Sequence, residues 1–94
     1  MTSRFRLDCD GLDVRMFFAE KIPNPKFSTG WIVDVRYMGL EIIGMAVDEE
    51  SAKNAIETFV FGLCAVHGLA EPPCLKDDNW DKLLVADDSN LKPQ

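Results

Sequence analysis

The 94-residue sequence lacks a long apolar run, an internal repeat and a low-complexity tract. Without about 18 consecutive apolar residues, it is not expected to form a transmembrane helix. Basic residues near the N-terminus are not followed by an apolar segment, so we expect no signal peptide. An apolar fraction of 47% is ordinary for a globular protein and argues against wholesale disorder. The length predicts a single domain over residues 1–94, with residues 87–94 frayed.

The motifs of common enzymes are also missing. The sequence has no glycine-rich phosphate loop, no GxSxG elbow and no HExxH pair. Cys64 and His67 suggest a nucleophile and its base, but no third, orienting group is evident. A zinc site formed by Cys9, Cys64, His67 and Cys74 has suitable ligand types, yet lacks the tight two-ligand spacing of structural zinc sites. We therefore expect no catalytic residue, no metal and no cofactor, and predict that the protein is not an enzyme.

Cysteine is scarce, and its three copies are an odd number. Since no export signal is expected, the simplest interpretation is that all three are reduced thiols. The sequence thus predicts a cytoplasmic protein.

Negative charge is concentrated in the second half of the chain. The formal net charge is −6; residues 1–47 carry six acidic and six basic side chains, so residues 48–94 hold all of the excess. An acidic domain repels nucleic-acid phosphates, so we expect no direct binding to DNA or RNA. A protein with a basic surface is the favoured partner, because complementary potentials steer association. The alternative is that the acidic residues only maintain solubility.

Four segments alternate between apolar and polar residues and predict an antiparallel meander, namely residues 4–9, 12–22, 31–38 and 40–47. Asp10-Gly11 has the composition of a two-residue hairpin turn, and Gly39 marks another. In the third segment, alternate residues from Trp31 to Tyr37 should face the core, and in the second Val14, Met16 and Phe18 can share a face. Prolines between the second and third segments predict a loop.

A helix is predicted over residues 49–67. Asp48 is a suitable N-cap, Glu49 and Glu50 favour the positive end of the helix dipole, and Gly68 suits the C′ position. The expected core stripe recurs at three- and four-residue steps and consists of Ala52, Ala55, Ile56, Phe59, Leu63 and Val66. Gly62 in the helix interior costs about 1 kcal/mol relative to alanine.

Phe61 and Cys64 fall outside this stripe and leave two interpretations open. Either a C-terminal segment folds back over them, or they form a surface for a partner or for a homodimer. Residues 78–85 could form a short helix, and residues 83–86 could equally add an edge strand. The predicted fold class is α+β: a four-stranded antiparallel β-meander with one long helix packed on one face and a short C-terminal element.

Three layouts resemble known families. The hairpin over residues 33–47 followed by residues 50–55 resembles the end of double-stranded-RNA-binding domains, which bind RNA through lysines at this helix start; here Lys53 is surrounded by acidic residues, which disfavours that role. The meander with an acid-capped helix is similar to HicB-type antitoxins, small dimeric proteins that neutralise a basic ribonuclease. The turns and apolar positions from Trp31 to Gly68 look like those of phage-encoded anti-CRISPR proteins that inhibit type I systems. That resemblance implies a compact acidic protein that occupies a basic nucleic-acid-binding surface.

The functional hypothesis is a non-enzymatic inhibitor that blocks such a surface, specifically a phage anti-CRISPR factor acting in the host cytoplasm. The alternative is a HicB-like antitoxin that neutralises a basic ribonuclease. A few aromatic contacts usually dominate an interface, so apolar anchors are expected beside the acidic groups. The candidate binding residues are Glu49, Glu50, Glu57, Asp77, Asp78 and Asp81 for the electrostatics, with Phe27 and Phe61 as anchors.

Overall fold

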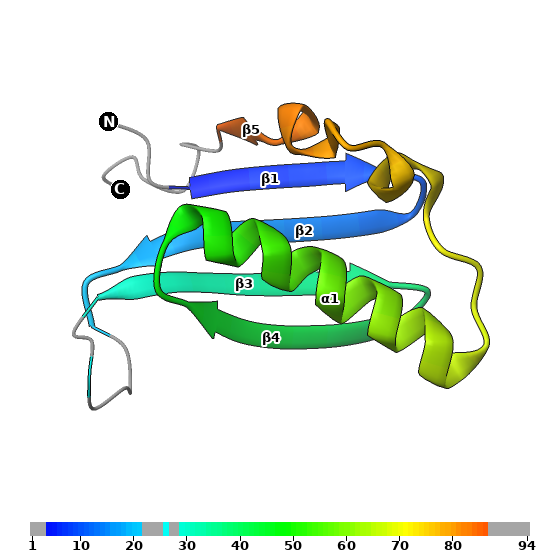
Figure 1. The fold of residues 1–94 in the computed structure, drawn as a ribbon, viewed down its shortest axis with the longest axis horizontal. Coiled ribbons are helices and arrows are strands. Elements are labelled where there is room, and N and C mark those ends of the chain that lie inside the picture. Colours follow the sequence, from blue (N-terminus) through cyan, green and yellow to red (C-terminus); the bar gives the residue numbers. More distant parts are fainter. Residues whose placement is uncertain (1–3, 22–25, 27–28, 87–94) are drawn as a thin grey trace, which may run out of the picture.

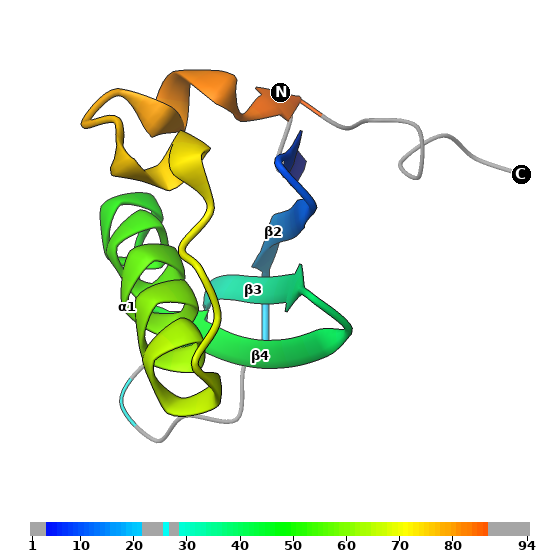
Figure 2. The same ribbon diagram turned by 90° about the vertical axis from the view of Figure 1, so that its right-hand side faces the viewer.

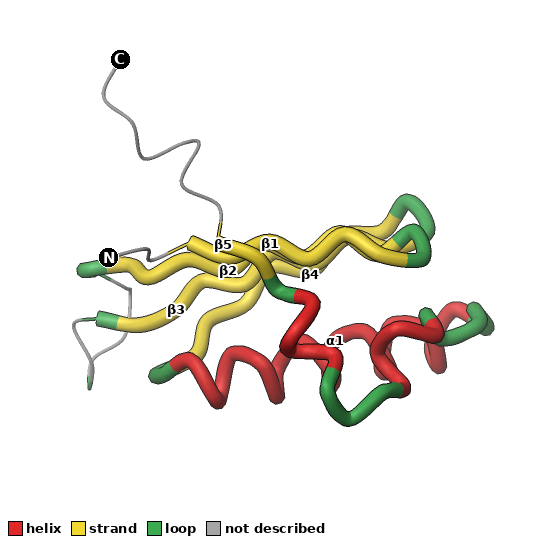
Figure 3. The backbone as a smooth tube through the Cα atoms, turned by 90° about the horizontal axis from the view of Figure 1, so that it is seen from above, coloured by secondary structure: helices red, strands yellow, loops and turns green. Residues whose placement is uncertain are grey.

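The computed structural model describes residues 4–21, 26 and 29–86, and these form an α+β fold with an open antiparallel sheet and one long helix. The sheet and the helix make two layers (Figures 1 and 3). In Figure 3 the helix and the C-terminal segment lie on the same side of the sheet, and no other described element covers its opposite face. Of the loop predicted over residues 22–30, residues 22–25 and 27–28 lie outside the described residues, as does the tail predicted to fray, and Gly30 belongs to the third strand.

The sheet has five strands in the order β4-β3-β2-β1-β5. Their bounds are β1 Arg4–Cys9, β2 Leu12–Ala19, β3 Gly30–Tyr37, β4 Leu40–Ala46 and β5 Val85–Ala86. The predicted meander of four strands is present, but the count of four is wrong because β5 pairs antiparallel with β1. Both interpretations of the C-terminal region hold in part: the 3-10 helix η2 spans Trp80–Leu83 and the edge strand β5 follows it.

Tight two-residue turns set the register of the meander. Asp10 and Gly11 have φ angles of 51° and 78°, and Met38 and Gly39 have φ angles of 52° and 79°. Positive φ at both central residues is the requirement of the type I′ turn, whose twist matches that of the flanking strands. The turns predicted at Asp10-Gly11 and at Gly39 are therefore confirmed.

Alternate residues of β1, β2 and β3 point toward the helix and form the core. The buried strand residues are Leu7, Leu12, Val14, Met16, Val33, Val35 and Tyr37. The prediction for the third segment holds, with Trp31 half-buried at its start. Phe18 is different: it shares the face of Val14 and Met16 but remains 40% exposed, because it lies near the end of β2 with its ring edge against Trp31.

The helix α1, Glu49–His67, has the predicted bounds and caps. The Ser51 amide donates to Asp48 Oδ1 over 2.7 Å, and Gly68 adopts a left-handed φ of 67°. The predicted core stripe is rotated from the observed one. The fully buried residues repeat every four positions and are Ala52, Ile56, Val60 and Cys64, whereas Val66 is 80% exposed.

The C-terminal segment causes this rotation by packing against one flank of α1. It leaves the helix, passes beside it and returns to β1 (Figure 2). It contains η1, Pro73–Lys76, and η2, which bury Leu75 and Trp80 respectively. The Tyr37 hydroxyl donates to the Ala70 carbonyl over 2.8 Å at the start of the segment. The fold-back interpretation of the Phe61 flank therefore holds, and Cys64 belongs to the core.

A disulfide joins Cys9 at the end of β1 to Cys74 in η1. Next to it, the Cys74 amide donates to Asp10 Oδ2 over 3.0 Å. The prediction of three reduced thiols is wrong in this structure, in which Cys64 alone of the three is free. The two bonded cysteines are 65 positions apart, and only the return of the C-terminal segment to β1 brings them together.

Replacing Gly44 by alanine is expected to destabilise the protein. A Cβ atom at this position of β4 would lie 2.5 Å from two ring carbons of Phe59, so the ring would have to leave its site. We expect a loss of roughly 1–3 kcal/mol in the free energy of unfolding, measured in urea. Phe59→Leu introduced into the Gly44→Ala background should recover part of that loss. Strictly additive losses would contradict the contact.

Removing the disulfide should destabilise the fold and loosen the C-terminal segment first. The free energy of unfolding of the double variant Cys9→Ser, Cys74→Ser is expected to be about 2–4 kcal/mol lower, because the crosslink restricts the unfolded chain over a long loop. Chemical denaturation with and without dithiothreitol measures the effect. The reductant should destabilise the parent protein and leave the double variant unchanged; equal stability of parent and variant would rule out a stabilising crosslink.

Candidate functional site

An acidic groove lies between α1 and η2. Its lining residues come from two helical turns of α1 and from the segment that folds back over them: Glu50, Lys53, Asn54, Glu57, Asp78, Trp80 and Asp81. The groove encloses a volume of about 160 Å³. Residues 50, 53, 54 and 57 are three or four positions apart and therefore lie on one side of the helix. The fold thus brings two acidic regions of the sequence, far apart along the chain, onto one surface.

Trp80 fixes the far wall of this groove. Its side chain is 3% exposed, and its indole Nε1 donates to Glu57 Oε1 over 2.7 Å. This bond satisfies the one polar atom of a buried aromatic ring. The bond also ties η2 to α1, so a specific contact connects the two walls of the groove.

Lys53 is the one cation of the groove lining and is already engaged. Its Nζ lies 3.5 Å from Glu49 Oε1 and 3.6 Å from Asp81 Oδ2. Among the described residues, no cation forms an ion pair with Glu50 or Asp78. Since one ammonium group cannot neutralise the surrounding carboxylates, the groove keeps a negative potential.

The predicted binding residues divide into three groups in the structure. Glu50, Glu57, Asp78 and Asp81 line the acidic groove, and Glu49 joins them through Lys53. Asp77 stands outside the lining and has a structural role, because its Oδ1 accepts a 2.9 Å bond from the Asn79 amide. Phe61, a predicted anchor, is half-buried and packs against the core. Phe27 lies outside the described residues.

The sequence matches no family model and no curated protein, and the fold matches no solved structure. No family is assigned. The resemblances to anti-CRISPR proteins, to HicB-type antitoxins and to double-stranded-RNA-binding domains therefore stay predictions. Within the part of the chain that the structure describes, no helix is long and apolar enough to cross a membrane.

The charges of the uncovered sheet face differ from those of the groove, because they pair with one another. Arg36 Nε donates to Glu41 Oε2 over 2.7 Å, and Arg36 Nη2 lies 3.6 Å from Asp34. Burial and the neighbouring carboxylate of Glu41 raise the pKa of Asp34, while the bond from Arg36 lowers the pKa of Glu41. Arg6 lies between Asp8 and Asp13 in the same way. The excess negative charge is therefore on the groove side of the molecule.

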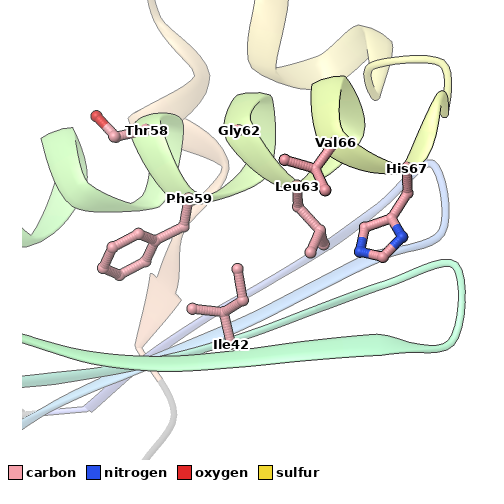
Figure 4. Close-up of a pocket in the computed structure, with 7 residues that line it drawn as sticks. All are labelled: Ile42, Thr58, Phe59, Gly62, Leu63, Val66 and His67. Carbon is pink, nitrogen blue, oxygen red and sulfur yellow. The ribbon is translucent and has the colours of Figure 1, made fainter.

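An apolar groove runs along the other flank of α1, between the helix and β4 (Figure 4). It encloses about 330 Å³ and is lined by Ile42, Thr58, Phe59, Gly62, Leu63, Val66 and His67. Figure 4 shows Ile42 rising from the sheet toward Leu63 and Phe59 of the helix. Phe59, Leu63 and Val66 were predicted to be core residues, so the sequence did not indicate this surface. The interior glycine at position 62 was the one sequence feature that set this flank apart.

The cysteines offer little support for nucleophile or zinc chemistry. Cys64 is buried, its thiol donates to the Ala70 carbonyl over 3.7 Å, and burial raises the pKa of that thiol. A thiolate is thus disfavoured where a nucleophile would need one. The sulfur atoms of Cys9 and Cys74 lie within 4.8 Å of an Asp10 carboxylate oxygen, but the disulfide leaves neither sulfur as a thiolate. The structure does not bring this pair together with Cys64 and His67 into one ligand set.

Removing the Glu57 carboxylate should expose the dependence of the groove on the indole bond. Glu57→Ala leaves the buried Trp80 N–H without its acceptor and is expected to cost about 1–3 kcal/mol of unfolding free energy. Glu57→Gln retains an acceptor oxygen and should cost less. Urea denaturation measures both.

Glu50→Ala is the matched control, because Glu50 lines the same groove without such a bond. We expect Glu50→Ala to change the free energy of unfolding by no more than about 0.5 kcal/mol. Equal effects of Glu57→Ala and Glu50→Ala would contradict the role of the bond.

Proposed function

We propose that this chain is a non-enzymatic binding protein whose acidic groove covers a basic surface of a partner protein. The observation that carries the proposal is the convergence of Glu50, Glu57, Asp78 and Asp81 around a single, already paired lysine. Acidic residues that only maintain solubility need not lie together in one groove. A basic protein surface supplies the charges that such a groove attracts.

The dimensions of the groove favour side chains of a protein over a free metabolite. Small-molecule sites usually enclose about 300–1,000 Å³ and are mostly apolar. The acidic groove, at about 160 Å³ with a polar lining, suits the end of one arginine or lysine side chain. A guanidinium group could donate to Glu50 and Asp78, which form no ion pair with any residue that the structure describes.

Direct binding to nucleic acid remains disfavoured in this proposal. The groove would repel a phosphate backbone. On the uncovered sheet face, Arg6, Arg15 and Arg36 are paired with carboxylates, and Arg4 lies over the Phe17 ring. A protein that binds nucleic acid through lysine and arginine is instead a natural target, because an acidic surface competes with phosphates for the same cations. The chain would inhibit such a target by occupying its nucleic-acid-binding surface, and no catalytic step would be needed.

The finer hypothesis is that the target is a CRISPR effector and that the chain is a phage anti-defence factor. The alternative, a HicB-like antitoxin, uses the same electrostatics against a basic ribonuclease. Capture of partners from a host lysate with the tagged full-length protein separates them, provided that nuclease-treated and untreated samples are compared by mass spectrometry. A stoichiometric effector subunit supports the first hypothesis, and a small basic ribonuclease supports the second.

Charge reversal in the groove should weaken the captured complex. The double variant Glu50→Lys, Asp78→Lys raises the formal net charge from −6 to −2. Both side chains are exposed and form no ion pair within the described part of the chain, so the fold should tolerate the change. We expect at least about a tenfold loss of affinity, greatest at low ionic strength where screening is weakest.

The control is Glu20→Lys, Glu71→Lys, which alters net charge by the same amount at exposed positions outside the groove lining. It should retain most of the affinity. An equal loss in both double variants would point to net charge alone, and an affinity independent of salt would contradict the electrostatic mechanism.

A further inference from the structure

We propose that two copies of this chain associate through the outer edge of β4, which no described strand pairs with, and the apolar groove beside it. β4 is an outer strand of the sheet and pairs on one side with β3. In the proposed dimer, two β4 strands pair antiparallel about a two-fold axis that passes by Ile43. The result is one continuous sheet of both copies with the two α1 helices on the same face.

The edge of β4 lacks the devices that usually prevent edge pairing. Natural edge strands carry charges, prolines or bulges that discourage a second chain. β4 contains one charged residue, Glu41, and that side chain is bound to Arg36. Ile43 is 65% exposed and Met45 is also exposed on the uncovered face of the sheet. An apolar edge of seven residues is a surface that a partner would cover.

The register of the β3–β4 hairpin directs the backbone hydrogen-bonding groups of alternate β4 residues toward the outer edge. Residues of an antiparallel strand bond alternately to one neighbour and to the other. Tyr37 and Leu40 close the two-residue turn and bond each other, so Glu41, Ile43 and Met45 direct their backbone groups away from β3.

Ile43 is the midpoint of β4, so the strand is complementary to itself there. Pairing Ile43 with its own copy places Glu41 opposite Met45 and Ile42 opposite Gly44. The large side chain of Ile42 thus faces the smallest residue of the strand on the helix side of the sheet. Because the register spans all of β4, it uses the full length of the edge, about 24 Å at 3.4 Å per residue.

Gly62 supplies the independent support for a second copy. It lies within α1, where glycine is unfavourable, and a Cβ atom added to it would meet nothing within 4 Å. No contact within the described chain therefore requires a glycine. It lies in the groove flank together with Val66, which is 80% exposed.

The two-fold axis would bring the second helix to this flank. Since α1 packs over β3 and β4, the two helix axes in the paired sheet would be separated by about two strand spacings, roughly 10 Å. Helices in contact have axes 8–10 Å apart, near the lower limit when small residues lie at the crossing. Gly62 and the neighbouring Thr58 are small enough for this approach, and Val66 and Leu63 would be buried by it.

The distribution of charge also favours this edge. The acidic groove lies on the opposite flank of α1, so the excess negative charge of each copy points away from the axis. The apolar groove has no carboxylate in its lining. The interface would consist of one strand edge and one helix flank, so we expect weak association with a dissociation constant in the micromolar range.

Sedimentation equilibrium of the full chain tests the proposal. The parent protein should show a monomer–dimer equilibrium that Ile43→Lys weakens at least tenfold. Val85→Lys is the matched control, because Val85 is 60% exposed on β5 at the other edge of the same sheet. It should leave the equilibrium unchanged. A monomer at about 0.5 mM, far above a micromolar dissociation constant, would overturn the proposal, as would equal effects of the two lysine variants.

A helix variant keeps the test decisive if Ile43→Lys perturbs the strand. Gly62→Gln adds a good helix former where the chain leaves open space, so the melting temperature of the monomer should rise. The longer side chain would meet the partner helix, so the dimer should weaken at least tenfold. A higher melting temperature with unchanged association would exclude the helix contact.

Crosslinking tests the register. Ile43→Cys should form an intermolecular disulfide with its own copy under mild oxidation, in a Cys64→Ala background that removes the free thiol. Glu41→Cys alone should crosslink poorly and should crosslink well when mixed with Met45→Cys. Efficient crosslinking of Glu41→Cys to itself would overturn pairing about Ile43.

Discussion

One helix cannot cover a five-stranded sheet, and this constraint shapes the rest of the molecule. An α-helix with its side chains is about 10 Å wide, whereas five strands at about 4.8 Å spacing extend about 19 Å between their outer axes. α1 packs on β3 and β4 and leaves the inner faces of β1 and β2 in need of cover. Leu75 and Trp80 of the C-terminal segment provide that cover, and both are buried. The acidic groove lies where these two covering elements, α1 and the C-terminal segment, meet.

Local rules made much of the fold predictable. Asp10-Gly11 and Gly39 marked turns that need positive φ, and Asp48 and Gly68 marked the two ends of the helix. These signals act within a few residues and do not depend on the remainder of the chain. The rotation of the helix could not be read in the same way, because apolar side chains occupy both flanks of α1. Val60 and Cys64 became core only because the C-terminal segment packs over their flank.

Contacts between distant segments were the part that the sequence did not reveal. The Cys9–Cys74 disulfide and the bond from Trp80 to Glu57 join residues 65 and 23 positions apart. The acidic residues of the groove were predicted from their charge, and charge alone did not separate Asp77, which lies outside the groove lining, from Asp78, which belongs to it. The sequence left the covering of Phe61 open, because the pattern of a single helix shows which residues are apolar and not what will cover them. The apolar groove was missed for the converse reason, since residues expected in the core lie at an edge that nothing described covers.

The disulfide turns most of the chain into a covalent ring. Residues 9–74 include the turn after β1, strands β2 to β4, all of α1 and the start of η1, so one peptide-bond cleavage within them leaves a single molecule of unchanged composition apart from added water. The two arms that leave this ring also meet each other, because Phe5 of the first pairs with Ala86 of the second. A nicked chain would consequently keep every strand attached to its neighbours through either the ring or the sheet. Proteolytic damage to the exposed connections would become visible only after reduction, which gives the molecule a tolerance to cleavage that a linear chain of this size lacks.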